Sequence, residues 1–349
     1  MKCICRITFV VFFTVFCFTL TAYAEPKPFS IGETTLKRIH HDENLLPDQG
    51  HSGFSSLLFD VDGNLVREDN GQAWLYTTGL FEAPTGGKRD WYGKWVSHVR
   101  TFNPKTLVSG EKKWALGLAD GEGWAVIHHA IKVDNDLYLV FYSTNVGVRA
   151  AVSTRPDAVF TAIPDFQLTV TEPWEDAGGE KDSLESCGGH VKIKNSQNVF
   201  EFYLIYDSYH VDATRGELGW AKLSLDKGSR KITLLEKHPG NPLDLRPENY
   251  IAARAGGNVA ADVRLDGLHT FFYYTRPNRN IIMLAAALSP DPLFQNITHR
   301  VEFDTPLGSE VVIEKFEAYT LGNVLHIIYE NKLSSGHWGT GIRLYEIVE

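Results

Sequence analysis

A short pattern recurs five times along the chain, and this repetition constrains the fold more than any other feature. Each copy is an apolar or aromatic run that ends in Tyr and is followed by small polar or charged residues. The tyrosines are Tyr76, Tyr142, Tyr206, Tyr274 and Tyr329, which lie 66, 64, 68 and 55 residues apart. Recurrence at such a spacing indicates a repeat architecture rather than a set of unrelated strands.

Each repeat predicts three or four antiparallel strands. An apolar stretch and a tight turn precede the Tyr run, as in residues 128–133 followed by Asp134-Asn135-Asp136, and a third strand-like run follows it. Convincing helical periodicity is absent, which disfavours a parallel α/β fold. A small sheet cannot bury both faces alone, whereas radial packing around an axis buries them. We therefore predict an all-β, five-bladed β-propeller, with a β-helix or two β-sandwiches as alternatives.

The first 24 residues predict a secretory signal peptide. Lys2 and Arg6 precede an apolar run, and Ala22-Tyr23-Ala24 supplies the small residues of a cleavage site. The run has about 14 residues, fewer than the roughly 20 that a membrane-spanning helix needs. We expect cleavage near Ala24 and a secreted or periplasmic protein without a membrane anchor. Residues 25–53 then form an N-terminal segment leading into the first blade, and residues 54–349 a single propeller domain.

Charge and cysteine content narrow the classes of partner. The formal net charge is −9 and there is no basic block, which disfavours nucleic acid. Three of the four cysteines lie in the signal, so Cys187 has no internal disulfide partner. A catalytic thiol at Cys187 is disfavoured in an oxidising compartment, so a buried structural cysteine is the better interpretation.

The repeats resemble blades of the five-bladed glycosidases of the arabinanase and β-xylosidase family and their invertase-like and mannoside-phosphorylase relatives. Residues 137–143, Leu-Tyr-Leu-Val-Phe-Tyr-Ser, match the family's aromatic strand, and residues 151–157, Ala-Val-Ser-Thr-Arg-Pro-Asp, match its A-x-S-x-x-P segment. The resemblance extends diffusely over residues 54–349. It implies a glycoside hydrolase-like enzyme that acts on a poly- or oligosaccharide, requires no cofactor and has room for a structural calcium ion in the central channel.

Glycoside cleavage uses two carboxyl groups that flank the scissile bond. The resemblance assigns the base or nucleophile to Asp62, in a segment expected to open the first blade. The alternative is that Asp62-Gly63 is simply a turn. The family's acid falls near Cys187, so Glu185, two residues away, is one candidate for the acid. Glu317, at the expected start of the last inner strand, is the other.

Further polar residues are expected where the inner strands start and where the loops after the second strands emerge on the same face. These candidate substrate-binding residues are His128, His129, His190, Asp262, Asp207 and Arg276. Arg276 suits a uronate carboxylate, and an exposed loop charge is its alternative. For any single histidine, a hydrogen-bonded structural role is the favoured interpretation, and the sequence does not define a metal site.

Two other functions stay open beside an exported glycoside hydrolase. The family places in its second blade an Asp that adjusts the pKa of the acid, but Ala130 stands there, which favours a catalytically silent propeller that binds glycan or protein. The histidines allow a metal-dependent hydrolase or lyase. A second carboxyl group at glycosidase distance favours the first function, and histidines at ligand distance favour the last.

Overall fold

The computed structural model describes residues 28–47, 52–80, 94–118, 122–175, 183–209, 217–245, 252–254, 263–278 and 281–348. Its regular structure is almost entirely β and includes a short 3₁₀ helix, η3 (Pro173–Glu175). The all-β prediction is therefore confirmed. No helix in these ranges is long and apolar enough to cross a membrane. The expected signal peptide lies outside the described residues.

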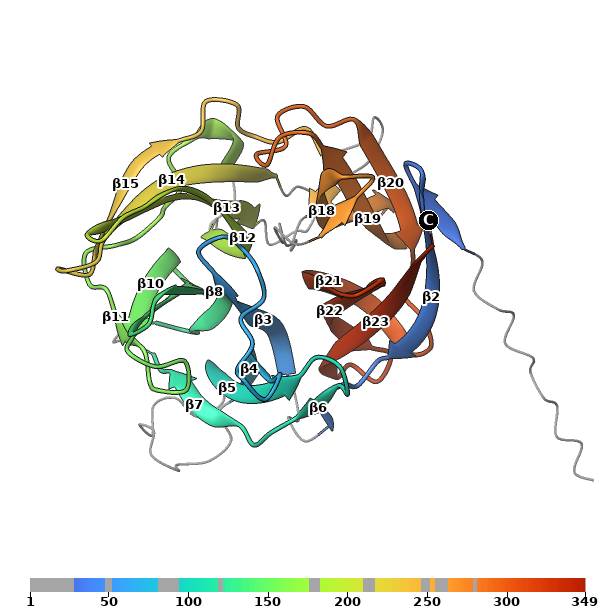
Figure 1. Cartoon of the computed structure of the whole chain (residues 1–349), viewed down its shortest axis with the longest axis horizontal. Helices are drawn as coiled ribbons and strands as arrows, with labels where there is room; N and C mark the ends of the chain where they lie inside the picture. The colour runs from blue at the N-terminus through green and yellow to red at the C-terminus, as the bar shows by residue number, and fades with distance from the viewer. Residues whose placement is uncertain are drawn as a thin grey trace, which may run out of the picture.

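Four hydrogen-bonded sheets surround a central axis, as in a β-propeller (Figure 1). The largest has nine strands and consists of two antiparallel groups. The first group comprises β3 (Ser52–Asp60), β4 (Ala73–Leu80), β5 (Trp95–Asn103), β6 (Val108–Ser109) and β7 (Lys113–Leu116). The second group comprises β8 (Val126–Asp134), β9 (Leu137–Thr144), β10 (Gly147–Ser153) and β11 (Thr161–Ala162).

The other three sheets follow in chain order around the axis. One contains β12 (Ser183–Asn195), β13 (Val199–Tyr209), β14 (Leu218–Asp226) and β15 (Lys231–Lys237). The next contains β16 (Ala252–Arg254), β17 (Arg264–Leu265), β18 (Leu268–Asn278), β19 (Ile281–Ser289) and β20 (His299–Asp304). The last contains β21 (Glu310–Leu321), β22 (Val324–Leu333), β23 (Trp338–Val348), β1 (Phe29–Ile31) and β2 (Thr34–Asp42).

The repeated tyrosines lie on the second main strand of each antiparallel group. They occupy β4, β9, β13, β18 and β22, and all five are buried. Apolar and aromatic residues of these strands and their neighbours form clusters between sheets, in which Phe141 of β9, for example, packs against Phe202 of β13. The repeat seen in the sequence is thus the part of each sheet that builds the core.

The inner strands meet around the axis (Figure 1). Strand β3 pairs in parallel with β8, so that Leu58 and Phe59 lie opposite Ala130 and Ile131. Strand β12 packs against β8, and β21 packs against β3, β12 and β18. This ring of inner strands brings side chains from different sheets together.

A β-bulge interrupts each of the inner strands β3, β8, β12 and β21 in its first half. On β21, Glu314 and Glu317 are opposite Glu330 and Ile328, so one extra residue lies on the inner strand. A bulge bends its strand and changes the direction of the side chains around it. The bulges therefore determine which side chains meet at the start of the inner strands.

Strands from both ends of the chain complete the last sheet, where β2 lies alongside β23 (Figure 1). Leu36 of β2 pairs with Ile347 of β23 and is fully buried. The segment that was expected to lead into the first blade thus also supplies an outer strand to the sheet formed by the C-terminus.

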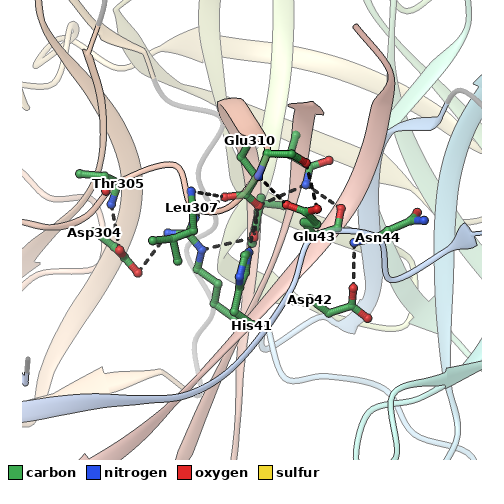
Figure 2. Close-up of polar contacts among 12 residues, drawn as sticks. His41, Asp42, Glu43, Asn44, Asp304, Thr305, Leu307 and Glu310 are labelled. Atoms are coloured by element: carbon green, nitrogen blue, oxygen red, sulfur yellow. Dashed lines mark hydrogen bonds and ion pairs between the residues drawn. The ribbon is translucent and has the colours of Figure 1, made fainter. Parts of the chain in front are cut away.

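A buried polar network ties this strand to its neighbours (Figure 2). The carboxylate of Glu310 accepts hydrogen bonds from Arg343 Nη2 at 2.6 Å and from the Tyr329 hydroxyl at 2.5 Å. His41 Nε2 of β2 lies 3.3 Å from it. Arg343 Nη1 forms an ion pair with Asp304 of β20 at 3.0 Å. Burial opposes ionisation of Glu310, but His41 and Arg343 outweigh it and lower its pKa to about 2.

Candidate active site

Acidic side chains and a lysine meet at the start of the inner strands. Asp207 lies on β13, Lys315 and Glu317 on β21, and Glu330 on β22. The three acidic residues are only 4%, 1% and 4% exposed, respectively. Lys315 Nζ and Asp207 Oδ2 are 3.7 Å apart and link two sheets. We call Asp207, Lys315 and Glu317 the axial cluster.

Glu317 lies against the backbone of the opposing inner strand β12. A Cβ atom on Gly188 would be 2.5 Å from Glu317 Oε1, so this close approach depends on the missing side chain of glycine. Burial raises the pKa of Glu317 well above its usual value, and a hydrogen bond with Ser56 opposes that rise. Burial therefore favours the protonated form of Glu317, which is the form that can donate a proton.

Lys315 occupies the bulge of β21 between Glu314 and Glu317. Its φ angle is 57°, in the left-handed region that residues other than glycine rarely adopt. Its side chain is 11% exposed and reaches Asp207 on another sheet. A nearby ammonium group favours the ionised form of a carboxylate.

Three of the residues expected from the sequence come together here. The backbone of Glu185 on β12 pairs directly with that of Asp207 on β13. Glu317 lies against Gly188, three residues further along β12. The structure thus gathers Glu185, Asp207 and Glu317 at one end of the axis, although the side chain of Glu185 is outside the described part of the structure.

Asp62 does not join this cluster, and the expectation that it opens the first inner strand is wrong. The inner strand is β3, which ends at Asp60, two residues before Asp62. Asp62 is in a turn in which Gly63 N donates to Asp60 O at 2.9 Å, and it forms an ion pair with Lys192. The turn interpretation of Asp62-Gly63 therefore holds, and Asp62 lies at the opposite end of β3 from the axial cluster.

The histidines do not form a metal site among the described residues. His129 and His190 lie close together in the interior, and His128 is also buried on β8. Burial lowers the pKa of His129 well below its usual value, and it lowers that of His190 to about 4. In the part of the protein that the structure describes, no three histidine, cysteine or acidic side chains gather as metal ligands would.

The side chains of two other expected residues lie outside the described part of the structure. Asp262 lies outside the described residues. The backbone of Arg276 on β18 pairs with Ala252 of β16, which sets its place in the ladder but not the course of its side chain.

The sequence pattern does not indicate Lys315 or Ser56 as part of the site. Lys315 is 108 residues from Asp207 along the chain, and its direction depends on a bulge. The one local signal is Gly188-Gly189, since adjacent glycines allow another segment to approach the backbone.

Solved structures of carbohydrate-active proteins share this fold. A BT0996–RGII complex has a TM-score of 0.57 at 10% identity, covering 85% of the present sequence and 88% of its own. A glycoside hydrolase has a TM-score of 0.57 at 11% identity, with coverage of 85% and 88%. Bacillus subtilis levansucrase has a TM-score of 0.53 at 10% identity, with coverage of 88% on both sides.

No protein-family model and no curated protein matches this sequence. At identities of 10–11%, these solved structures confirm that the protein resembles them in fold, as the sequence indicated.

Proposed function

Starting from the fold that this protein shares with glycoside hydrolases, we propose that it cleaves glycosidic bonds in a poly- or oligosaccharide. The observation that carries the proposal is that Asp207 and Glu317 lie at one end of the axis in opposite environments. Burial favours the protonated form of Glu317, whereas the Lys315 ammonium, 3.7 Å from Asp207, favours the carboxylate. Carboxyl groups whose environments separate their protonation states are suited to acid and base roles. We count the two groups of the nine-stranded sheet as separate blades, which gives a propeller of five.

The proposed reaction follows the two-carboxyl scheme. Glu317 donates its proton to the glycosidic oxygen as the bond from that oxygen to the anomeric carbon breaks. Asp207 takes a proton from water, whose oxygen bonds to the anomeric carbon, or it attacks that carbon directly. In the second case, water then hydrolyses the glycosyl ester. Glu185 is the second candidate for the base, because it pairs with Asp207.

The base or nucleophile is therefore Asp207 and not Asp62, the residue that the sequence resemblance indicated. Asp62 lies beyond the far end of β3 and is paired with Lys192. It therefore provides a matched control, since it is a carboxylate paired with a lysine at the other end of the same axis.

Substrate binding belongs to the same proposal. His128, Asp262 and Arg276 remain candidates for contacting sugar hydroxyls or a carboxylate. His129 and His190 are better explained as a structural pair, because each ring faces the other inside the protein. The reaction needs no cofactor. A structural calcium ion would be detected as a loss of thermal stability on dialysis against EDTA that added calcium reverses.

The test is hydrolysis of a panel of aryl-glycosides and polysaccharides by the purified protein. We expect Glu317→Gln and Asp207→Asn to lower kcat by about 10²–10⁴-fold with unchanged circular dichroism. Asp62→Asn should keep wild-type activity. Loss of activity in Asp62→Asn, with full activity in the other two variants, would instead place the site at Asp62.

The burial of the axial cluster favours a second candidate, a catalytically silent propeller that binds glycan. Asp207 and Glu317 are 4% and 1% exposed, which leaves little surface to contact a sugar. Glycan binding in calorimetry, without turnover of any bound glycan over a long incubation, would support this function over the enzyme.

Export is part of the proposal too. N-terminal sequencing of the protein recovered from the medium or the periplasm should begin at Glu25. Recovery from the cytoplasm with Met1 intact would contradict it.

A further inference from the structure

Lys315 is held in an unusual conformation that directs it at one partner. It occupies the bulge of β21 with a φ angle of 57°. For a residue other than glycine, this conformation is strained and persists only when the surrounding structure enforces it. Bulges next to active sites commonly re-aim a side chain. At Lys315, the re-aimed side chain reaches a carboxylate on another sheet.

The Lys315–Asp207 pair is enclosed rather than superficial. The side chains are 11% and 6% exposed, respectively, and the two residues come from the last sheet and the β12–β15 sheet. An ion pair removed from water is screened little by salt and depends strongly on the presence of both partners. Loss of the lysine would leave Asp207 buried without this charge.

Other acidic residues lie around Asp207 on the packed strands. Glu185 pairs with it in the ladder of β12 and β13. Glu217 is next to its neighbour, since Ser208 N donates to Glu217 O at 2.9 Å. Glu317 is two residues from Lys315 on β21, and burial favours its uncharged form. Like charges favour the neutral form of a carboxyl group and a nearby cation favours its ionised form, so Lys315 acts on Asp207 in the opposite direction to an acidic neighbour.

We propose that Lys315 is a positioning residue for the reaction, which keeps the Asp207 carboxylate ionised and fixes its direction toward the axis. This inference rests on the proposed function, in which Asp207 is the base or nucleophile. Lys315 does not touch the reacting atoms and acts only through Asp207.

The experiment compares Lys315→Met and Lys315→Arg with the wild type. Lys222→Met is the control, because Lys222 is also a strand lysine near a carboxylate, with Glu236 Oε1 at 3.9 Å. We expect Lys315→Met to move the acidic limb of the pH profile of kcat/KM upward by about one unit or more. It should also lower kcat with little change in KM. Lys315→Arg should restore the limb, and Lys222→Met should not move it.

A second measurement does not depend on turnover. The carboxyl ¹³C resonance of Asp207, assigned with Asp207→Asn, is titrated in the wild type and the lysine variants. Its midpoint should rise by about one unit or more in Lys315→Met. If Lys315→Met does not fold, Lys315→Asn takes its place, because asparagine tolerates the left-handed conformation.

The outcomes separate the two proposals. An unchanged titration of Asp207 in folded Lys315→Met or Lys315→Asn overturns the role of Lys315, whatever the activity. A shifted titration in a protein that hydrolyses no glycoside supports the control of Asp207 by Lys315 and overturns the glycosidase. A shifted titration with an unmoved kinetic limb overturns the role of Asp207 as the group that Lys315 serves in catalysis.

Discussion

His129 Nε2 and His190 Nδ1 lie 2.8 Å apart between the inner strands β8 and β12. His190 Nε2 lies 3.2 Å from the carbonyl oxygen of Val61 and donates to it. In a neutral ring the other nitrogen then accepts, so His190 Nδ1 accepts from His129 Nε2. The contact therefore fixes the tautomers of both rings in their uncharged forms, which burial favours.

Stability should therefore fall as the solution becomes mildly acidic. Burial lowers the pKa of His190 from 6.5 to about 4. The unfolded polypeptide takes up a proton below pH 6.5 that the folded protein does not take up until about pH 4. The stability contributed by neutral His190 is complete above pH 6.5 and is lost as pH falls to about 4. The loss is about 3 kcal/mol.

Urea unfolding between pH 7.5 and 4 measures this loss. We expect His190→Gln to be less stable than the wild type at pH 7.5 but to have a flatter dependence on pH. His299→Gln is the control, because His299 is exposed, and it should keep the wild-type slope. Equal slopes in all three proteins would contradict the assignment.

Glu310→Gln should destabilise the protein by about 3–5 kcal/mol, because it leaves the buried Arg343 without its closest carboxylate. The contribution of the ionised Glu310 carboxylate to stability is complete above pH 4.5, and it disappears as pH falls toward about 2. Asp157→Asn, which breaks an ion pair with the 58% exposed Lys113, should cost less than about 1 kcal/mol. Denaturant unfolding at pH 7 compares the two, and equal effects would contradict a structural role for the network.

Gly188→Ala should displace Glu317, since the added Cβ would lie 2.5 Å from its Oε1 atom. Crowding of this kind in a packed interior costs about 1–3 kcal/mol. Gly228→Ala is the control, because its Cβ would find its nearest neighbour, Asp226 Oδ1, at 3.6 Å. Thermal unfolding should separate the variants. If Gly188→Ala is as stable as Gly228→Ala, the close packing of Glu317 on β12 is not present in solution.

Leu36→Ala should loosen the strand that joins the two ends of the chain. Leu36 is fully buried and pairs with Ile347, so its truncation should cost about 2–5 kcal/mol. Backbone amides of β23 should then exchange with deuterium faster than those of β13. Val348→Ala, at a 42% exposed position on β23, is the control and should leave exchange unchanged. Equally faster amide exchange in every sheet of Leu36→Ala would contradict an opening confined to the sheet that contains β2 and β23.

The repeated tyrosines allowed prediction of the all-β architecture because their signal is local. An apolar run ending in Tyr marks the second strand of each group wherever it occurs. The first inner strand was misplaced because two apolar stretches flank one turn. Leu57-Leu58-Phe59 precedes it and Leu65-Val66 follows it, and Phe59 and Leu65 form a bridge across it. Either stretch could form the inner strand. Only the pairing between strands in the folded sheet shows that the first stretch does.

The axial cluster could be predicted only in part. Glu317 and Asp207 were found because each was expected near a strand end, Asp207 in the third repeat and Glu317 in the fifth. Lys315 and Gly188 were not, since their contacts join residues far apart in the sequence. The direction of the Lys315 side chain and the position of Gly188 also depend on bulges. One extra residue in a strand changes the face on which every later side chain lies.

The pairing of β2 with β23 also determines the order in which the molecule can be completed. Strand β2 leaves the ribosome long before its hydrogen-bonding partner β23, which lies far along the sequence from it. Until then β2 has no β23 to pair with, and exposed strand edges promote association between molecules. Contacts of such long sequence separation slow folding. Closure of the ring is therefore a late event in folding, and chaperones that hold the polypeptide open should raise the yield.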